Sequence, residues 1–153
     1  MKHTSRRRAL TVAAAALVVG LGAAGTAVAL PATDLVEGTP CSATARACVD
    51  LATDRAWLID DGEVSHGPVP ISHGGQGTET PTGDFGVQRK ARDHRSVEFD
   101  GAKMPWSVFF APGGIAFHEG DQDTSSAGCV RLGRADAVKF FHELDVYDRV
   151  EVR

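Results

Sequence analysis

Short stretches in which apolar and polar residues alternate dominate the chain from about residue 47 onward. Residues 47–59 alternate in pieces, Asp60-Asp61-Gly62 is typical of a tight turn, and residues 63–69 return, which together predict a β-hairpin. Further short strands are predicted over residues 85–91, 93–99, 106–111, 115–118 and 146–152.

Only one segment has a helical pattern. From about residue 134 to residue 144, apolar residues recur at helical spacing, namely Ala137, Val138, Phe141 and Leu144. Asp136 in the first turn complements the helix dipole. Pro68, Pro70 and the glycines within residues 74–77 predict a loop ahead of the later strands. The chain is therefore expected to be mainly β, a sandwich or barrel-like mixed sheet with one short C-terminal helix.

The first residues have the pattern of an export signal. Residues 2–8 carry four positive charges, residues 9–21 are apolar, and Ala27-Val28-Ala29 supplies the small residues of a cleavage site. Residues 1–29 therefore predict a secretory signal peptide cleaved after Ala29, with no stable membrane insertion after cleavage. An uncleaved anchor is the alternative, which the short apolar core disfavours. The adjacent arginines leave Sec and twin-arginine export both open.

After the signal segment we expect a short linker over residues 30–46 and a single domain over residues 47–153. The signal segment holds four of the 16 basic residues and none of the 20 acidic ones, so the mature chain has a formal net charge of about −8. A chain this acidic is not expected to bind nucleic acid.

Three cysteines remain in the exported chain. Cys41 and Cys48 lie close together and would meet an oxidising compartment, which favours a disulfide between them. Cys129 would then keep its thiol, which could act as a nucleophile. The alternative, a bridge from Cys129 to the N-terminal region, would remove the candidate nucleophile.

His118 ends an apolar strand, and Cys129 follows after ten residues. An imidazole beside a thiol can take its proton, and the thiolate can attack a carbonyl carbon. Gly128 allows close approach of the backbone and, with Cys129, could supply oxyanion-hole N–H groups. Arg131 is a candidate for a forked contact to substrate, and Ser126 for orienting the histidine or bracing the loop. Cys129 and His118 also have purely structural interpretations, as a buried core cysteine and a surface histidine.

Other candidate features give weaker indications of function. His66 and His73 have no recognisable metal-ligand spacing with His94, so neither a metal nor another cofactor is predicted. The sequence Asp93-His94-Arg95 fits either the wall of a substrate groove or a solvated turn.

Three motifs together resemble a known family. His118 followed by Ser126-Ala127-Gly128-Cys129-Val130-Arg131 is similar to the signature of the L,D-transpeptidase (YkuD-like) catalytic domain, in its small exported actinobacterial form. The stretch from Thr80 to Phe85 resembles that family's strand entry, and Met104 to Phe110 resembles the segment before its catalytic histidine. Ala127 departs from the pattern, since many members have histidine there.

The resemblance implies an enzyme that acylates its cysteine with a tetrapeptide stem of peptidoglycan, expels the terminal D-alanine, and passes the acyl group to an amine. By residue, Cys129 would be the nucleophile and His118 the base and acid, with Gly128 and Ser126 in support. Substrate-binding positions would be Arg131, Gly114, Met104 and Trp106. Such an enzyme is expected to be secreted to the cell wall and to form covalent adducts with carbapenem-type β-lactams.

Two other functions remain alternatives. A sortase-like transpeptidase also uses Cys, His and Arg in a β domain, although its Thr-Leu-x-Thr-Cys motif is missing here. A non-catalytic peptidoglycan-binding protein on the same fold would have no need of the Cys129 and His118 pair.

Overall fold

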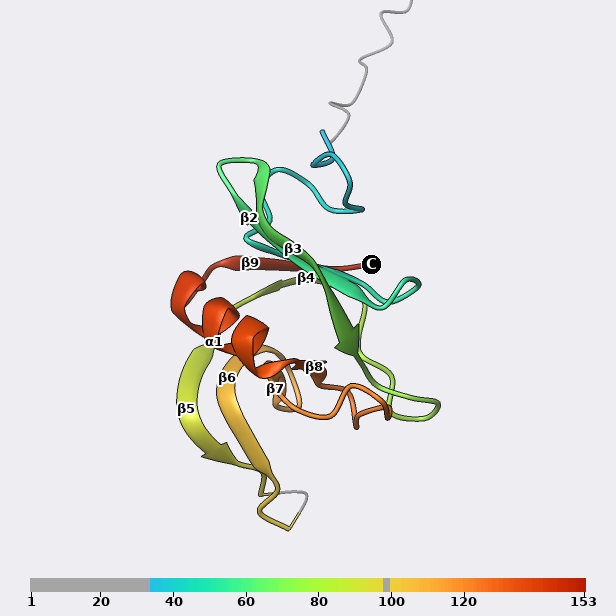
Figure 1. Ribbon diagram of the computed structural model, residues 1–153, viewed down its shortest axis with the longest axis vertical. Helices are drawn as coiled ribbons and strands as arrows, with labels where there is room; N and C mark the ends of the chain where they lie inside the picture. The colour runs from blue at the N-terminus through green and yellow to red at the C-terminus, as the bar shows by residue number, and fades with distance from the viewer. Residues whose placement is uncertain (1–33, 98–99) are drawn as a thin grey trace, which may run out of the picture. The chain divides into compact units, whose positions relative to one another are not determined.

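The computed structural model describes residues 34–97 and 100–153, so the predicted signal segment and Phe99 lie outside the described residues. Within these two ranges, nine strands form one mixed sheet in the order β4-β9-β1-β2-β3-β8-β7-β6-β5, and one helix packs against it (Figure 1). The elements are β1 (Ala47–Asp50), β2 (Arg55–Asp60), β3 (Glu63–Ser72), β4 (Gly83–Gly86), β5 (Arg89–Arg95), β6 (Lys103–Ala111), β7 (Ile115–Glu119), β8 (Val130–Leu132), α1 (Arg134–Glu143) and β9 (Arg149–Val152). This mainly β mixed sheet with one short helix confirms the predicted fold class.

The alternating stretch 47–59 is two strands instead of one. The Asp50 carboxylate accepts hydrogen bonds from the Ala52 N–H at 3.0 Å and the Thr53 hydroxyl at 2.6 Å, which ends β1 in a turn before β2 begins. The second turn is where it was predicted: Asp61 and Gly62 both have positive φ, as a two-residue hairpin requires.

Strand β3 continues through Pro68 and Pro70, where a loop was predicted. The Pro70 carbonyl accepts a hydrogen bond from the Gln122 side chain, so its backbone faces away from β2. Strand β8 pairs with β3 only at Ile71 and Ser72. A proline at this unpaired edge removes no ladder hydrogen bond, which is why the strand tolerates it.

The stretch 85–91, predicted as one strand, is divided between β4 and β5 at the two ends of the sheet order. Val87 is buried at the break, where its backbone bonds with Tyr147 and Asp148, while the next N–H bonds to Phe109. The predicted strand 93–99 is not separate, because β5 itself runs to Arg95.

Two elements near the C-terminus also differ from the prediction. Strand β8 was not predicted, because three residues are too few to show alternation. Strand β9 begins at Arg149 instead of Val146, since the Asp148 carboxylate accepts the Asp145 N–H at 2.8 Å and closes a turn.

The main core lies between α1 and the sheet. Helix α1 contacts β6 and β7 (Figure 1). Between them the tilted rings of Phe110, Phe117 and Phe140 pack in series, with centroids 4.7 and 5.1 Å apart. The helix spans the predicted residues, and Ala137 and Leu144 of the predicted apolar face are buried. No helix in the described ranges is long and apolar enough to cross a bilayer.

The described part of the predicted linker packs onto the domain. A disulfide joins Cys41 to Cys48, and Val36 and Cys41 are buried in a second apolar cluster with Trp57 of β2. Residues 34–46 therefore pack against β1 and β2 instead of forming a free tail.

A buried carboxylate holds this extension. Glu151 on β9 is fully buried and accepts hydrogen bonds from the N–H and hydroxyl of Ser42 at 3.0 and 2.5 Å. Arg149 and Arg153 complete the cluster at 3.0 and 2.6 Å. Burial acts to raise the pKa of Glu151, but the Ser42 hydrogen bonds and the arginine charges outweigh it and the pKa is lowered.

Candidate active site

Parallel pairing of β7 with β8 places His118 and Cys129 on one face of the sheet. Phe117 pairs with Val130, and both point into the core. Because side chains alternate along a strand, His118 and its partner Arg131 point to the other face. Cys129, two residues before Arg131 and directly ahead of β8, lines the same cavity as His118.

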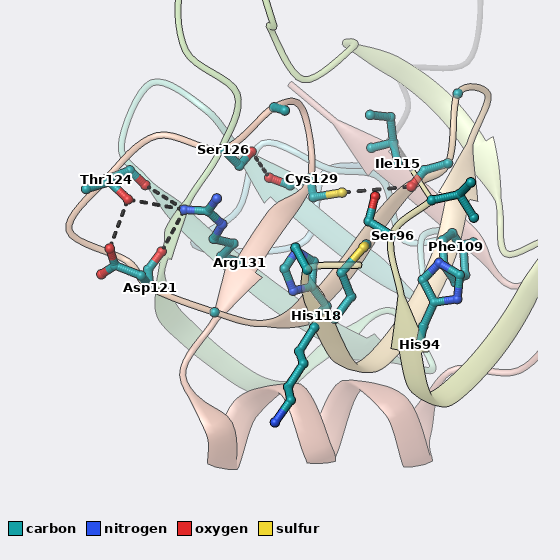
Figure 2. A pocket seen from close by; sticks show the side chains of 18 of the residues that line it. His94, Ser96, Phe109, Ile115, His118, Asp121, Thr124, Ser126, Cys129 and Arg131 are labelled. Atoms are coloured by element: carbon teal, nitrogen blue, oxygen red, sulfur yellow. Dashed lines mark hydrogen bonds between the residues drawn. The ribbon is translucent and has the colours of Figure 1, made fainter. Parts of the chain in front are cut away.

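That face forms one wall of a cavity of about 650 Å³. The side chains of His118 and Cys129 both line it, and Figure 2 shows the imidazole and the sulfur turned into the same space. The Cys129 Sγ lies 3.8 Å from the Gly114 carbonyl oxygen. Cys129 keeps its thiol, since the disulfide involves the other two cysteines.

His118 is held as a neutral base. Its Nδ1 donates to the Glu119 carbonyl at 2.7 Å, because a carbonyl can only accept, and Nε2 therefore carries the lone pair. The side chain is 6 % exposed. Burial is the main cause that lowers the pKa of His118; the Glu119 hydrogen bond opposes it, and the positive charges of Arg131 and His94 add to it. A base that is neutral near pH 7 can accept a thiol proton.

The loop before Cys129 is braced by Ser126. Its hydroxyl donates to the Cys129 carbonyl at 2.5 Å and accepts the Gly128 N–H at 3.0 Å, while its own N–H donates to the His73 carbonyl at 2.8 Å. Of the two roles considered for Ser126, these contacts favour bracing the loop over orienting His118.

These contacts also bear on the role expected for Gly128. Its N–H is already bonded to Ser126, so it does not serve as an oxyanion donor in this conformation. What requires glycine is the backbone: φ is +111°, and a Cβ here would lie 2.6 Å from Ile115 Cδ1.

Thr80 ties the preceding loop to the nucleophile. Its buried hydroxyl donates to the Gly128 carbonyl at 2.7 Å and accepts the Gly74 N–H at 2.9 Å. Sequence reasoning recognised Thr80 only as part of a strand-entry motif and assigned it no contact. The Thr-Pro pair in that motif was the available signal.

Arg131 braces a loop in this structure. Its guanidinium donates to the carbonyls of Asp121 and Thr124 at 3.4 and 3.3 Å and to the Thr124 hydroxyl at 3.2 Å (Figure 2). The Asp121 carboxylate in turn accepts the Asp123 N–H and the Thr124 hydroxyl. In this structure Arg131 thus supports the short loop between His118 and Cys129, and it also lines the cavity, so the expected forked contact to substrate stays a prediction.

Gly114 and Met104 line the cavity, whereas Trp106 does not. Trp106 packs edge-on against Phe141 of α1, with ring centroids 5.4 Å apart. The reason is local: Trp106 has φ of +59°, which interrupts the strand alternation that would have placed it beside Met104. The substrate-contact role expected for Trp106 stays a prediction, and this cavity lends it no support.

The cavity has a basic side that the motifs did not reveal. Arg89, His94 and Lys103, from β5 and β6, also line it, and Figure 2 shows His94 on the far side of His118 from Arg131. Of the sequence Asp93-His94-Arg95, only His94 reaches this cavity.

Two further histidines, His66 and His73, form separate pairs with carboxylates. His66 bonds to Asp136 at 2.8 Å, and His73 lies 3.1 Å from Asp54. Among the residues that the structure describes, no three His, Cys, Asp or Glu side chains converge as a metal site.

Comparison with known proteins adds an independent observation. Residues 44–152 match the model of the YkuD family, the L,D-transpeptidase catalytic domain. A search among curated proteins finds no significant match.

Several solved structures share the fold. An L,D-transpeptidase from Stackebrandtia nassauensis is 28 % identical with a TM-score of 0.65, covering 70 % of this chain and 54 % of its own. An L,D-transpeptidase in complex with imipenem is 22 % identical with a TM-score of 0.63, and the match covers 70 % of this chain and 57 % of that structure's chain. L,D-transpeptidase 3 from Mycobacterium tuberculosis, with a faropenem-derived adduct, is 20 % identical with a TM-score of 0.62, covering 70 % and 59 %. The match thus spans little more than half the length of each structure.

Proposed function

Because the chain belongs to the L,D-transpeptidase catalytic-domain family (YkuD), we propose that it is an exported enzyme that cross-links peptidoglycan through an acyl-enzyme on Cys129. The donor is a tetrapeptide stem, the leaving group is its terminal D-alanine, and the acceptor is an amine.

The single observation that carries the proposal is the parallel pairing of β7 with β8. It brings an imidazole with a lone pair on Nε2 and a thiol to the same cavity. His118 Nε2 takes the proton of Cys129, and the sulfur bonds to the carbonyl carbon of the donor's L-centred diamino acid. The tetrahedral species collapses as the carbon–nitrogen bond breaks, and the imidazolium returns the proton to the departing D-alanine.

The second half reverses these roles. The acceptor amine attacks the thioester carbon and His118 takes the proton that the amine loses. The carbon–sulfur bond then breaks and the thiol is restored. A cavity of about 650 Å³ is large enough for a peptide segment, and it opens directly onto the sulfur.

A β-lactam provides the sharpest test. Two structures of similar fold contain imipenem and a faropenem-derived adduct, respectively. We expect wild-type protein incubated with imipenem to gain one covalent adduct by intact-protein mass spectrometry, and Cys129→Ala to gain none. Glu143→Gln on the exposed face of α1 is the matched control and should react like wild type. A folded wild-type protein with an intact thiol and no adduct would exclude the proposal.

A peptide assay tests the reaction itself. Wild-type protein given a tetrapeptide stem and an amine acceptor should release D-alanine and form a cross-linked product, while His118→Gln should do neither. The family match disfavours the sortase-like alternative. A non-catalytic peptidoglycan-binding protein would retain the stem without releasing D-alanine.

The proposed export rests on separate observations. Residues 1–29 have the signal-peptide pattern, and the Cys41–Cys48 disulfide is a bond that persists in oxidising compartments. Sequencing the N-terminus of protein recovered from outside the cell should give Leu30, and recovery of uncleaved protein in the cytoplasm alone would contradict export.

A further inference from the structure

The charges that line the cavity differ from those of the chain as a whole. The chain carries more acidic residues than Lys and Arg, yet three Lys or Arg side chains line this cavity, Arg89, Lys103 and Arg131, together with His94 and His118. Among the described lining residues the only carboxylate is Asp121. A cavity of this composition favours an anionic occupant.

The two walls are not equivalent. On one wall, the Asp121 carboxylate accepts a hydrogen bond from the Thr124 hydroxyl. The Arg131 guanidinium donates to the Asp121 carbonyl and the Thr124 hydroxyl of the same loop. On the other wall, Arg89 and Lys103 make no ion pair with any described residue. The uncompensated positive charge therefore lies on the side of β5 and β6.

An aromatic ring organises this basic wall, which consists of Arg89, His94 and Lys103. The Arg89 guanidinium lies 3.4 Å from the centroid of Phe109, its cross-strand partner. His94 meets the same ring edge-on, with centroids 5.0 Å apart and an interplanar angle of 86° (Figure 2). Stacking on a buried ring limits the orientations of a guanidinium and leaves its N–H edges available to a ligand.

The basic wall acts on the same space as the proposed catalytic groups. The positive charge of His94 contributes to lowering the pKa of His118, so the two side chains interact electrostatically. Met104, which pairs with His94 across the strands, clusters with Phe109 and with Cys129. A ligand bound next to the Cys129 sulfur is therefore close enough to the basic wall to be attracted by its positive charge.

We propose that the basic wall binds a carboxylate of the donor peptide, so that the enzyme prefers a donor with ionised internal carboxylates over the same peptide with those groups as carboxamides. This inference rests on the proposed function. A carboxylate accepts paired N–H bonds from a guanidinium and carries the complementary charge, whereas a carboxamide has one acceptor oxygen and no charge. The selectivity thus depends on charge at a distance from the reacting bond.

The test compares two synthetic tetrapeptide donors that differ only in whether the non-reacting internal carboxylates are free or amidated. Wild-type protein should acylate with a kcat/KM about tenfold higher for the free form, a difference that a charged hydrogen bond supplies. The ratio should fall as salt is raised, because screening weakens the attraction. Equal kcat/KM values for the two donors would overturn the inference while leaving the proposed function intact.

Variants locate the effect. In Arg89→Gln/Lys103→Gln the ratio should fall to within about twofold, through loss of activity on the free form alone. Arg92→Gln is the matched control, because Arg92 lies on the same strand but stacks on Trp106 at 4.7 Å, outside the cavity. A double variant that folds and keeps the tenfold preference would refute the assignment to this wall.

Binding to Cys129→Ala separates recognition from chemistry. Titration of this variant should give a Kd about tenfold lower for the free form than for the amidated form. If folded wild-type protein forms no adduct with imipenem and releases no D-alanine, the proposed function fails. In that case equal Kd values would overturn the carboxylate site too, and a retained preference would support it as a peptide-binding site.

Discussion

The hydroxyl of Thr80 donates a 2.7 Å hydrogen bond to the carbonyl of Gly128, the residue directly before Cys129. The same hydroxyl accepts the Gly74 N–H, so one buried oxygen connects two loops that are distant in sequence. The position of the proposed nucleophile therefore depends on a side chain that plays no part in proton transfer.

Replacing Thr80 tests that dependence. Thr80→Val keeps the shape but leaves a buried carbonyl and a buried N–H without their partner, and it should destabilise the domain by about 1–3 kcal/mol. Acylation by imipenem should slow as well. Thr80→Ser retains the hydroxyl and should restore most of both, as measured by urea unfolding and by the rate of adduct formation. A Thr80→Val variant with unchanged stability and acylation would contradict the bracing role.

Gly128→Ala tests the backbone of the nucleophile loop. The added methyl group would lie 2.6 Å from Ile115 Cδ1, and φ of +111° is unfavourable for alanine. The substitution should cost about 1–3 kcal/mol and slow acylation. Adding Ile115→Val removes the methyl group that clashes and should recover only part of the loss, since the backbone strain persists. Full recovery in thermal unfolding would show that the clash, not φ, is what excludes alanine.

The lowered pKa of His118 predicts the acid limb of activity. The reaction needs a neutral imidazole, so activity should be present above the pKa of His118 and lost as pH falls through it. Because burial and nearby positive charge lower this pKa, the midpoint should lie below the ordinary histidine value of about 6.5. The measurement is kcat/KM for the peptide donor from pH 4 to pH 8.

His94→Gln provides the companion measurement. Removing this positive neighbour should move the acid limb toward higher pH, while Lys139→Gln on the exposed face of α1 should leave it in place. An acid limb above the ordinary histidine value in wild-type protein would mean that His118 is not the base.

The lowered pKa of Glu151 predicts how the stability of the fold changes at acid pH. Its pKa is lowered on folding, so its contribution is present above the unfolded carboxyl value of about 4.3 and is lost as pH falls through the lower folded value. Glu151→Gln removes a buried charge from between the partly exposed Arg149 and Arg153, weakens its hydrogen bonds, and should cost about 1–2 kcal/mol at pH 7.

The control for Glu151 is Glu143→Gln, which breaks only an exposed pair with Lys139 and should cost less than about 0.5 kcal/mol. Chemical denaturation at pH 7 and pH 4 measures both variants. If wild type and Glu151→Gln differ equally at the two pH values, the Glu151 charge is not the source of the stability.

Several features followed from the sequence because their causes are local. The helix from Arg134 to Glu143 shows in the spacing of its apolar residues, and the β2–β3 turn shows in Asp61-Gly62, which suits two positive φ values. The candidate pair of His118 and Cys129 came from residue chemistry together with a motif. Each of these signals is contained within a few neighbouring residues.

Other features depended on contacts that no local pattern encodes. Whether residues 85–91 formed one strand or two was decided by Val87, which bonds to the β9 region while Gln88 bonds to β6. The Trp106 side chain packs against α1 and does not line the cavity, because its backbone has a left-handed φ of +59°. The Gly128 N–H, expected as an oxyanion donor, is bonded in this structure to the Ser126 hydroxyl two residues away.

The sequence by itself thus determined the family, the mainly β class and the reactive residue types, because chemistry and periodicity are properties of short segments. Only the tertiary structure decided that β7 and β8 pair in parallel, and that Arg89, His94 and Lys103 share a cavity with Cys129. Strand order and register depend on burial and hydrogen bonding between residues far apart in the chain, and those interactions exist only once the sheet has formed.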